Sequence, residues 1–303
     1  MPATLGNIIR NLPTYRKSLA TIRQAIQETQ PDLIINFLEP LMGVYNLLNN
    51  HKIPVLVVGH QYMLEHPDFV HEKKFRMEQL GMKFYIAVTG AKSSRMALSF
   101  YQAPDMPHRK FFVSPPILRR QLFALRPDFS DGHLLIYLLN HGYAEEIINW
   151  HRENPEIPIE CFYDKPGAPE EDKVDATLTF HKIHGEKFLR LMSTARGVAC
   201  TAGFESVSEG AYLGKPLLLI PVENHLEQYL NALDAERTGL GMYDSKFHLS
   251  RLLEGPKGEA TSKFREWVNQ ADAIAMRAVE KVARESCPCV PVPTAETPVP
   301  LGR

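Results

Sequence analysis

The sequence lacks an excess of either charge and lacks any long apolar run. Lys and Arg together number 34 and Asp and Glu number 35, which gives a formal net charge of -1. Without a basic excess the chain has little to neutralise a phosphate backbone, so we expect no nucleic-acid partner. The longest apolar runs, such as 134–139, fall far short of the roughly 18 residues that span a bilayer. We therefore predict no transmembrane segment and no signal peptide.

Cysteine is scarce, and its four copies are unevenly spread, at Cys161, Cys200, Cys287 and Cys289. This number and spacing cannot build a disulfide framework. The one close pair lies in a proline-rich tail without further His or Cys partners for a metal. We predict reduced thiols, no bound metal and no cofactor. A reducing cytoplasm fits best, with a peripheral position at a membrane as a further expectation.

Apolar stretches alternate with amphipathic helical stretches along most of the chain. The composition, 44% hydrophobic and 23% charged, is that of a globular protein, and 303 residues suffice for two domains. Helices between apolar strands predict right-handed crossovers and parallel sheets, an α/β fold. The predicted strands are 33–37, 53–58, 84–88, 111–113, 134–139, 159–163, 176–180, 198–201 and 217–220. The predicted helices are 13–30, 41–50, 143–153, 185–194, 204–213, 227–238 and a long one over 261–286.

Two prolines mark the boundary between the predicted halves. Ser114-Pro115-Pro116 follows the first series of strands, and proline fixes the backbone and removes a hydrogen-bond donor. We predict a first domain over 1–116, a second over 117–286 that includes the long final helix, and a disordered proline-rich tail over 287–303. Both domains would be Rossmann-like, doubly wound parallel sheets. Ligands of such folds bind at the carboxyl ends of the strands, here in the cleft between the domains.

The most informative segment is 200–209, CTAGFESVSE, where a predicted strand ends and a helix begins. Gly203 allows a tight turn and a close approach of the backbone to a ligand. The free N–H groups at the start of the helix, together with its dipole, favour an anion such as a diphosphate. Ser206 and Ser208 add hydroxyl donors, and Glu209 could accept two ribose hydroxyls. An alternative stays open, in which Ser206 and Glu209 form a capping pair and Gly203 is only a turn.

The residues that follow this segment resemble a known family. Gly203 is followed, in order, by Ser206, Glu209, Gly214-Lys215-Pro216, Pro221, Glu227-Gln228 and Asn231-Ala232. This ordered set resembles the donor half of GT-B glycosyltransferases, in particular family 28 and, more distantly, the UDP-glycosyltransferases. The strong match covers residues 198–242. The resemblance implies a GT-B fold whose second domain binds a nucleotide diphosphate sugar.

The resemblance also implies roles for individual residues on the donor side. The ribose hydroxyls would bind Glu209, and the diphosphate would be contacted, largely through the backbone, by Gly203, Phe204 and Ser206. Contacts to the transferred sugar would come from Glu227 and Gln228, in a loop braced by Asn231. Further phosphate contacts would come from the loop Asn140-His141-Gly142. The nucleotide base would rest on the backbone of the turn His181-Lys182-Ile183.

Two departures from the family pattern concern the phosphate contacts. Many UDP-glycosyltransferases carry a phosphate-binding histidine where this chain has Thr201, and an asparagine where it has Glu205. Because like charges repel, a carboxylate beside a diphosphate is unfavourable unless it points away from it. The resemblance therefore fixes the phosphate site less firmly than it fixes the ribose site.

The first domain is expected to supply the acceptor site and a general base. Relatives place a glycine-rich segment with a histidine in its first loop, but no Gly-x-Gly-His string occurs in residues 1–60, and the chain opens on a helix. We therefore expect this domain to be truncated at its start. The predicted bases are His60 and Glu39, each at the end of a predicted strand. The alternative for both is that they line the cleft or cap turns.

The sequence thus predicts a glycosyltransferase that moves a sugar from a nucleotide diphosphate sugar, in the first place a UDP-sugar, to an acceptor hydroxyl. The resemblance implies inversion at the anomeric carbon, and the lack of an Asp-x-Asp motif agrees with metal independence. The acceptor stays open. A lipid-linked acceptor would suit a chain whose arginines at 119, 120 and 126 touch an anionic membrane, but a linker helix has the same pattern. Two alternatives remain, a nucleotide-sugar 2-epimerase of the same fold and a non-catalytic nucleotide-sugar binder.

Overall fold

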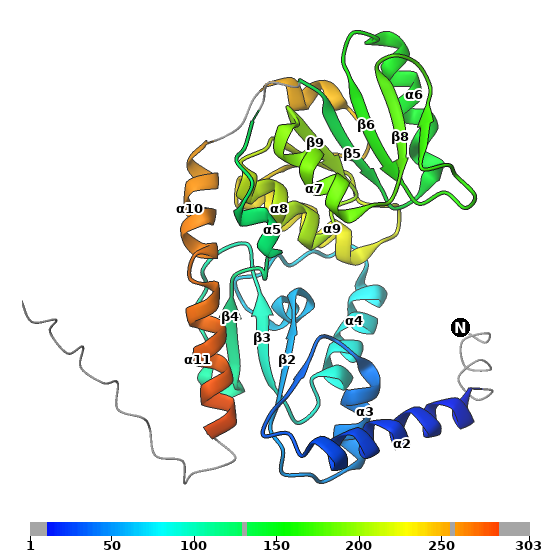
Figure 1. The fold of residues 1–303 in the computed structure, drawn as a ribbon. Coiled ribbons are helices and arrows are strands. Elements are labelled where there is room, and N and C mark those ends of the chain that lie inside the picture. Colours follow the sequence, from blue (N-terminus) through cyan, green and yellow to red (C-terminus); the bar gives the residue numbers. More distant parts are fainter. Residues whose placement is uncertain (1–10, 129–131, 255–257, 285–303) are drawn as a thin grey trace, which may run out of the picture.

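The computed structural model describes residues 11–128, 132–254 and 258–284. Its strands form two separate sheets, one of four strands and one of seven, which lie one above the other in Figure 1. Each strand runs parallel to its neighbours except β7, which pairs antiparallel with β8. The predicted α/β fold with two parallel sheets is confirmed. The predicted tail over 287–303 lies outside the described residues.

The first sheet has the order β1-β2-β3-β4, so its strands follow one another in space as they do in the chain. They are β1 (Ile34–Asn36), β2 (Val55–Gly59), β3 (Ser94–Leu98) and β4 (Phe111–Ser114). All residues of β2 are buried, as expected for a continuous apolar run that is covered on both faces. The neighbouring helices are α2 (Leu12–Thr29), α3 (Pro40–Leu48), α4 (Arg76–Thr89) and the 3-10 helix η1 (His60–Glu65).

One predicted strand of this half is wrong. Residues 84–88 form the last turns of α4, and the strand that follows in the sheet is β3. A short apolar run fits a strand or a helix equally well, and here the longer pattern decides. Along α4 only Ile86 and Thr89 are buried, whereas Phe84 is 71% exposed. The helix then ends at Gly90, whose N–H bonds to the carbonyl of Ile86.

The second sheet has the order β11-β10-β9-β5-β6-β8-β7, so the strand that comes first in the chain, β5, lies at its centre. Its strands are β5 (Leu134–Leu138), β6 (Ile159–Tyr163), β7 (Glu171–Lys173), β8 (Leu178–Lys182), β9 (Gly197–Cys200), β10 (Leu217–Leu219) and β11 (Met242–Tyr243). The edge strands β7 and β11 were not predicted. The helices that connect them are α6 (Ala144–Glu153), α7 (Gly185–Thr194), α8 (Phe204–Leu213) and α9 (Leu226–Arg237).

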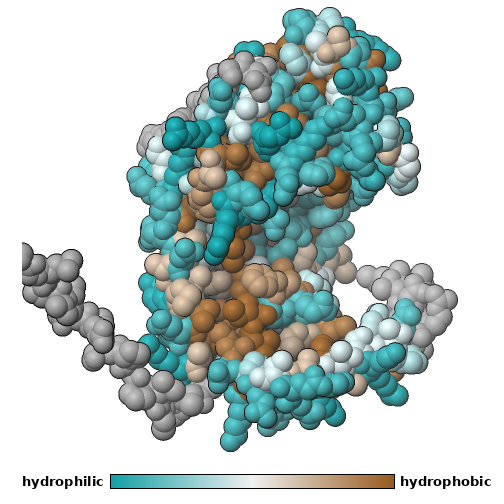
Figure 2. Space-filling view, in the orientation of Figure 1, coloured by the Kyte–Doolittle hydropathy of each residue, from teal (hydrophilic) through white to brown (hydrophobic). Residues whose placement is uncertain are grey.

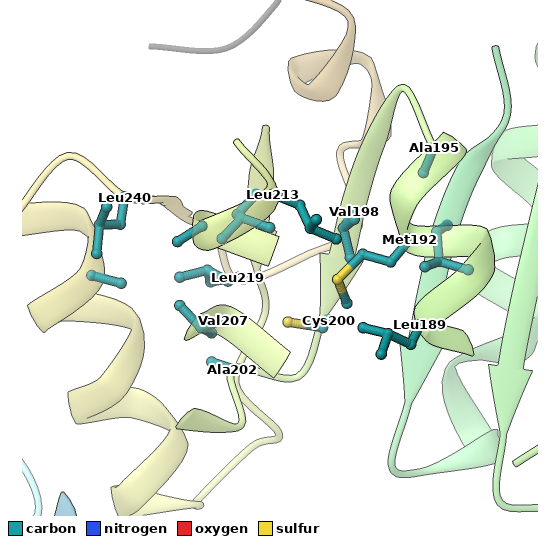
Figure 3. Close-up of a cluster of buried hydrophobic side chains, with 14 of the residues drawn as sticks. Leu189, Met192, Ala195, Val198, Cys200, Ala202, Val207, Leu213, Leu219 and Leu240 are labelled. Carbon is teal, nitrogen blue, oxygen red and sulfur yellow. The ribbon is translucent and has the colours of Figure 1, made fainter. Parts of the chain in front are cut away.

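The core of the second half fixes the strand and helix that meet at residues 200–204. In Figure 3, Val198 and Cys200 of β9 lie between Met192 of α7 and Val207 of α8. These side chains are buried, and so is Ala202 in the connection between β9 and α8. Because the strand and the helix are both anchored in one packed cluster, the connection between them has a defined shape.

The final helical segment consists of two helices rather than one. α10 (Gly258–Val268) is followed by α11 (Ala271–Arg284), and both run along one side of the molecule in Figure 1. Trp267 of α10 donates from its indole nitrogen to the Ser99 carbonyl at 3.0 Å. Ala278 and Val282 of α11 pack on the first sheet, against Leu56, Val58, Met96 and Phe112. The last helix, which the predicted boundaries place with the second domain, thus covers the first sheet.

Candidate functional site

A cleft of about 470 Å³ lies where the carboxyl ends of β2 and of β9 face each other across the two halves. Four apolar residues of the first half line it, and we call them the apolar wall: Phe37, Leu38, Val58 and Leu98. Six residues of the second half form what we call the polar wall: Thr201, Gly203, Glu205, Ser206, Glu227 and Gln228. The lining is completed by Gly59, His60 and Gln61 from the first half and by Tyr137, Leu139 and Phe204 from the second. In Figure 2, apolar side chains gather below the junction of the halves, while hydrophilic ones predominate above it. The site therefore combines two faces of different chemistry.

The polar wall is built around the start of α8. This helix begins with Gly203 as its N-cap, and no side chain caps it. The first intrahelical bond runs from the N–H of Val207 to the carbonyl of Gly203. The N–H groups of Phe204, Glu205 and Ser206 consequently have no intrahelical acceptor. Together with the helix dipole, they form an anion-binding end at the cleft.

The tight turn before α8 falls at Ala202 rather than at Gly203. Ala202 has φ +56°, in the left-handed region, whereas Gly203 has φ -67°, which any residue adopts. The prediction that Gly203 supplies the turn is therefore wrong. A Cβ added at Gly203 would meet no heavy atom within 4 Å, so packing inside the protein does not require glycine there either. Glycine is among the residues favoured at an N-cap, and without a side chain it also leaves the start of α8 open to the cleft.

Glu209 does not form the capping pair that the sequence left open as an alternative. Its carboxylate accepts two hydrogen bonds from Arg119, from Nε to Oε1 at 2.6 Å and from Nη2 to Oε2 at 2.7 Å. The Glu209 side chain is 6% exposed, and that of Arg119 is 40% exposed. A charged carboxylate is thus held, nearly buried, between one and two turns after the start of α8.

The start of α9 brings three further predicted residues to the same place. Glu227 lines the cleft and accepts a hydrogen bond at 2.9 Å from Gln61, which comes from the first half. The Gln228 side chain accepts from the N–H of Val222 at 2.9 Å, which fixes the loop before α9. Asn231 is buried and donates to the Ala202 carbonyl at 3.0 Å. Asn231 therefore ties α9 to the turn that precedes α8.

His60 stands at the junction of the two halves, where β2 ends. Its ring stacks on Phe204 with a centroid distance of 3.9 Å and an interplanar angle of 16°. Nδ1 lies 2.7 Å from the Leu98 carbonyl, and since a carbonyl only accepts, Nδ1 carries the proton and donates. Nε2 keeps its lone pair and is buried without a hydrogen-bond partner among the described residues. Burial lowers the pKa of His60 to about 4, against the raising effects of Leu98 and Asn231, so the ring is neutral at pH 7.

Glu39, the other predicted base, is placed differently. It is exposed and caps α3, where its carboxylate accepts from the N–H of Leu41 at 3.1 Å. It is not among the residues that line the cleft. Its neighbour Tyr85 has a pKa raised above the ordinary value, first by burial and then by the charges of Glu39 and Glu227. The structure therefore gives Glu39 a capping contact and leaves His60 at the cleft.

The remaining predicted residues lie beside the cleft, at the carboxyl ends of β5 and β8. The Asn140 side chain accepts from the N–H of Gly142 at 2.9 Å, which closes the turn after β5. His141 donates from Nδ1 to the Asp164 carbonyl at 3.1 Å. Ile183, after β8, is 41% exposed. None of these four lines the cleft itself, and they form a separate rim on the second sheet.

Sequence reasoning missed two partners of the predicted residues. Arg119 was assigned to a linker helix or a membrane contact, and it instead binds Glu209. Gln61 follows His60 directly but was not considered, and it binds Glu227 across the junction. No spacing in the sequence indicates either pair, because both are tertiary contacts between residues far apart in the chain, 90 residues for Arg119 and Glu209 and 166 for Gln61 and Glu227.

The described residues contain neither a cluster of metal-binding side chains nor a membrane-spanning helix. Across residues 11–128, 132–254 and 258–284, no group of three or more His, Cys, Asp and Glu side chains could hold a metal ion. No helix in that same part of the chain has the length and apolarity to cross a membrane.

Comparisons with known proteins identify the family and the fold of the chain. The sequence profile of glycosyl transferase family 1 matches residues 2–253. Curated proteins gave no significant match. Among solved structures, Arabidopsis thaliana UGT89C1 in complex with quercetin superposes with a TM-score of 0.59 at 12% identity, covering 95% of this chain and 80% of that one. Phytolacca americana UGT2 in complex with UDP-2-fluoro-glucose and pterostilbene superposes at 0.57 with 16% identity, covering 90% and 80%.

A third solved structure also superposes on this chain. The glycotransferase of kitacinnamycin gives a TM-score of 0.55 at 15% identity, covering 93% of this chain and 80% of that one. At such low identities the superposed structures show the fold only. The family is shown by the profile match, which covers most of the chain. The chain belongs to glycosyl transferase family 1 and is a glycosyltransferase of the GT-B fold.

Proposed function

We propose that this glycosyltransferase moves a sugar from a nucleoside diphosphate sugar, with UDP-sugars as the first candidates, to the hydroxyl of an apolar acceptor. One observation carries the proposal. The uncapped start of α8 opens into the cleft, and the carboxylate of Glu209 lies farther along the same helix. The two features match the diphosphate and the ribose diol of one ligand.

On the donor side, the diphosphate would accept hydrogen bonds from the N–H groups at Phe204, Glu205 and Ser206. As the bond to the sugar breaks, negative charge grows on the leaving diphosphate, and preorganised N–H groups with the helix dipole stabilise it. This stabilisation supports metal independence. The rim at Asn140, His141, Gly142 and Ile183 would flank the outer parts of the nucleotide.

The transferred sugar would lie between the diphosphate and the start of α9. Glu227 can accept sugar hydroxyls at its second carboxylate oxygen while the first holds Gln61. The oxygen of Gln228 is committed to Val222, so its amide nitrogen is the group that faces the sugar. Asn231 would act indirectly, through the turn at Ala202 that it fixes.

On the acceptor side, the apolar wall would bury an apolar molecule that carries the reacting hydroxyl. The Phe37 side chain is 66% exposed, and a bound acceptor would bury it. The hydroxyl oxygen attacks the anomeric carbon as the bond to the diphosphate oxygen breaks, which inverts the configuration. We assign the hydroxyl proton to Nε2 of His60, the unpartnered ring nitrogen whose lone pair the Leu98 contact preserves.

The test is product analysis with a donor labelled in its sugar. Purified protein is incubated with UDP-sugars and a panel of phenols and long-chain alcohols, and the products are separated and examined by NMR. We expect a labelled glycoside whose anomeric configuration is opposite to that of the donor. An epimerised nucleotide sugar, or retention of configuration, would contradict the proposal, and so would binding of donor without any product.

A further inference from the structure

Arg119 lies in the segment that joins the two sheets, directly before the short helix α5 (Arg120–Phe123). Besides its two bonds to Glu209, its Nη1 donates to the Gly185 carbonyl at 3.3 Å. A planar guanidinium that binds both oxygens of a carboxylate leaves neither oxygen free in that direction. The carboxylate is nearly buried while Arg119 is 40% exposed. Within this ion pair, solvent therefore reaches the guanidinium but hardly reaches the carboxylate.

The guanidinium occupies the space between the starts of two helices. Glu209 belongs to α8, and Gly185 is the first residue of α7, two residues after Ile183. In the proposed function these two points hold the ribose and flank the base. A nucleoside that enters this space meets Arg119, and its ribose diol competes with the guanidinium for the same two carboxylate oxygens.

The charges around α8 require a cation when an anion binds. Glu205 and Glu227 line the cleft, and no Lys or Arg is among the described residues that line it. The hydrogen bonds to Glu209, and then the negative charges of Glu209 and Glu205, raise the pKa of Arg119 above its usual range against the effect of burial. The negative charge of Glu205 thus acts on Arg119, and a guanidinium that moved towards the start of α8 would offset part of the repulsion between this carboxylate and a diphosphate.

Along the axis of α8, Glu209 lies about 7.5 Å from Phe204 at the helix start, five residues at 1.5 Å each. An arginine side chain that leaves Glu209 can cover a length of this order. The open side of the guanidinium allows it to rotate out of the pair without repacking of the core. Arginine binds phosphate through the same fork that now binds the carboxylate.

We propose that Arg119 is a donor-binding residue that exchanges partners. It holds Glu209 in the empty protein, and it turns to the diphosphate when the ribose takes the carboxylate. This inference rests on the proposed function. The exchange gives both Arg119 and Glu209 a partner in each state, and it supplies a phosphate-binding cation to a cleft that no Lys or Arg among the described residues lines. It also predicts that the site discriminates between a nucleotide and the nucleoside without phosphate.

The experiment compares UDP with uridine on the wild type and on three variants, by calorimetry for UDP and NMR titration for uridine. Arg119→Ala removes both contacts, Arg119→Lys keeps the charge but loses the fork, and Arg120→Ala changes the exposed neighbour as a control. We expect Arg119→Ala to weaken UDP binding about tenfold or more, because a charge-assisted contact is lost. Uridine should bind Arg119→Ala as well as or better than the wild type, because its competitor for Glu209 is gone. Arg119→Lys should fall between, and Arg120→Ala should match the wild type.

The ratio of the two affinities separates this role from a structural one, and melting curves show that each variant is folded. An equal loss for UDP and uridine would mean that Arg119 only braces Glu209 and would overturn the inference. Equal gains in affinity for UDP and uridine would mean that Arg119 only blocks Glu209 and does not contact phosphate. Unchanged affinities would place Arg119 outside the site, and either result would contradict the inference. A wild type that binds neither UDP, TDP nor GDP would overturn the proposed function itself. If instead the wild type binds UDP but Arg119→Ala prefers UDP over uridine by the same factor, only the inference about Arg119 fails.

Discussion

The two walls of the cleft differ in what they can hold. The polar wall offers uncapped N–H groups, three carboxylates in or beside it and the Gln228 amide, all on helices that start at the cleft. The apolar wall offers Phe37, Leu38, Val58 and Leu98 with a single buried ring nitrogen, on His60. A charged nucleotide suits the first and an apolar hydroxyl compound the second. This difference is the basis for our proposal that each half of the molecule binds one of the two substrates.

Two contacts join the halves at the cleft. His60 stacks on Phe204, and both of these residues were predicted site residues. Gln61, which the sequence did not indicate, donates to Glu227. Both contacts link the end of β2 to the starts of α8 and α9. The reacting groups of donor and acceptor should therefore meet there, and substitutions at these places should separate binding from turnover.

The largest expected effect concerns the base. His60→Asn should lower turnover about 10²–10⁴-fold, because general-base catalysis contributes that much, while donor affinity stays unchanged. Steady-state kinetics combined with calorimetry on the same preparation measures both. Glu39→Gln is the matched comparison and should keep its turnover, because Glu39 caps α3 and does not line the cleft. A fully active His60→Asn would assign proton removal to another group.

A second prediction concerns two buried titratable groups at the junction, which respond to acid in opposite directions. Burial lowers the pKa of His60 to about 4, and burial raises the pKa of Asp234 to about 6 against the lowering effect of Arg237. The unfolded chain protonates His60 more readily, so this contribution to stability is present above about pH 6.5 and is lost towards pH 4. Protonated Asp234 favours the folded state, so its contribution is present below about pH 4 and is lost as the pH rises through about 6.

Thermal unfolding at a series of pH values measures both contributions. His60→Asn should make stability less sensitive to acid between pH 6.5 and 4, and Asp234→Asn should make it more sensitive. Each change is at most about 3 kcal/mol, from 1.36 kcal/mol per pKa unit. Curves that move in the same direction for the two variants would contradict the assignment.

The third prediction weakens the polar wall alone. Glu209→Gln should reduce affinity for UDP about tenfold to a hundredfold, since a hydrogen bond to a charged group contributes about 1.5–3 kcal/mol. Glu205→Gln, one turn earlier on α8, serves as the control. It should bind UDP as well as the wild type or better, because a carboxylate beside the diphosphate is removed. Equal losses in both variants would show that the whole helix start had been disturbed.

The smallest expected effect concerns the apolar wall. Phe37→Ser should raise KM for the acceptor several-fold without changing donor affinity, because the ring would no longer be buried by the acceptor. Leu48→Ser, equally exposed on α3 but away from the cleft, should leave KM unchanged. A loss of donor affinity in Phe37→Ser would mean that the two walls do not divide the substrates as proposed.

The sequence was most informative where helices and strands alternate with regular spacing. The bounds predicted for α7 and α8 coincide with the structure. The observed β9 is shifted by one residue at both ends, and β10 ends one residue earlier than predicted. Apolar strands flanked by amphipathic helices leave little choice of structure there. The segment 84–88 was mistaken for a strand because a short apolar run carries no periodicity of its own.

The chemistry of the site was less predictable than its position. The resemblance named Glu209, but this residue does not line the cleft, and its partner Arg119 comes from ninety residues earlier in the chain. The left-handed turn falls on Ala202, where local preference favours the adjacent Gly203. Ala202 packs in the core, and its carbonyl accepts a hydrogen bond from Asn231. These two tertiary contacts hold Ala202 in the left-handed conformation.

The most direct test of the central claim is the structure of the protein with UDP bound. We expect phosphate oxygens within about 3.2 Å of the N–H groups at the start of α8, as hydrogen bonds require, and both ribose hydroxyls on Glu209. UDP bound away from α8, with these N–H groups and Glu209 contacting nothing of the ligand, would contradict the account.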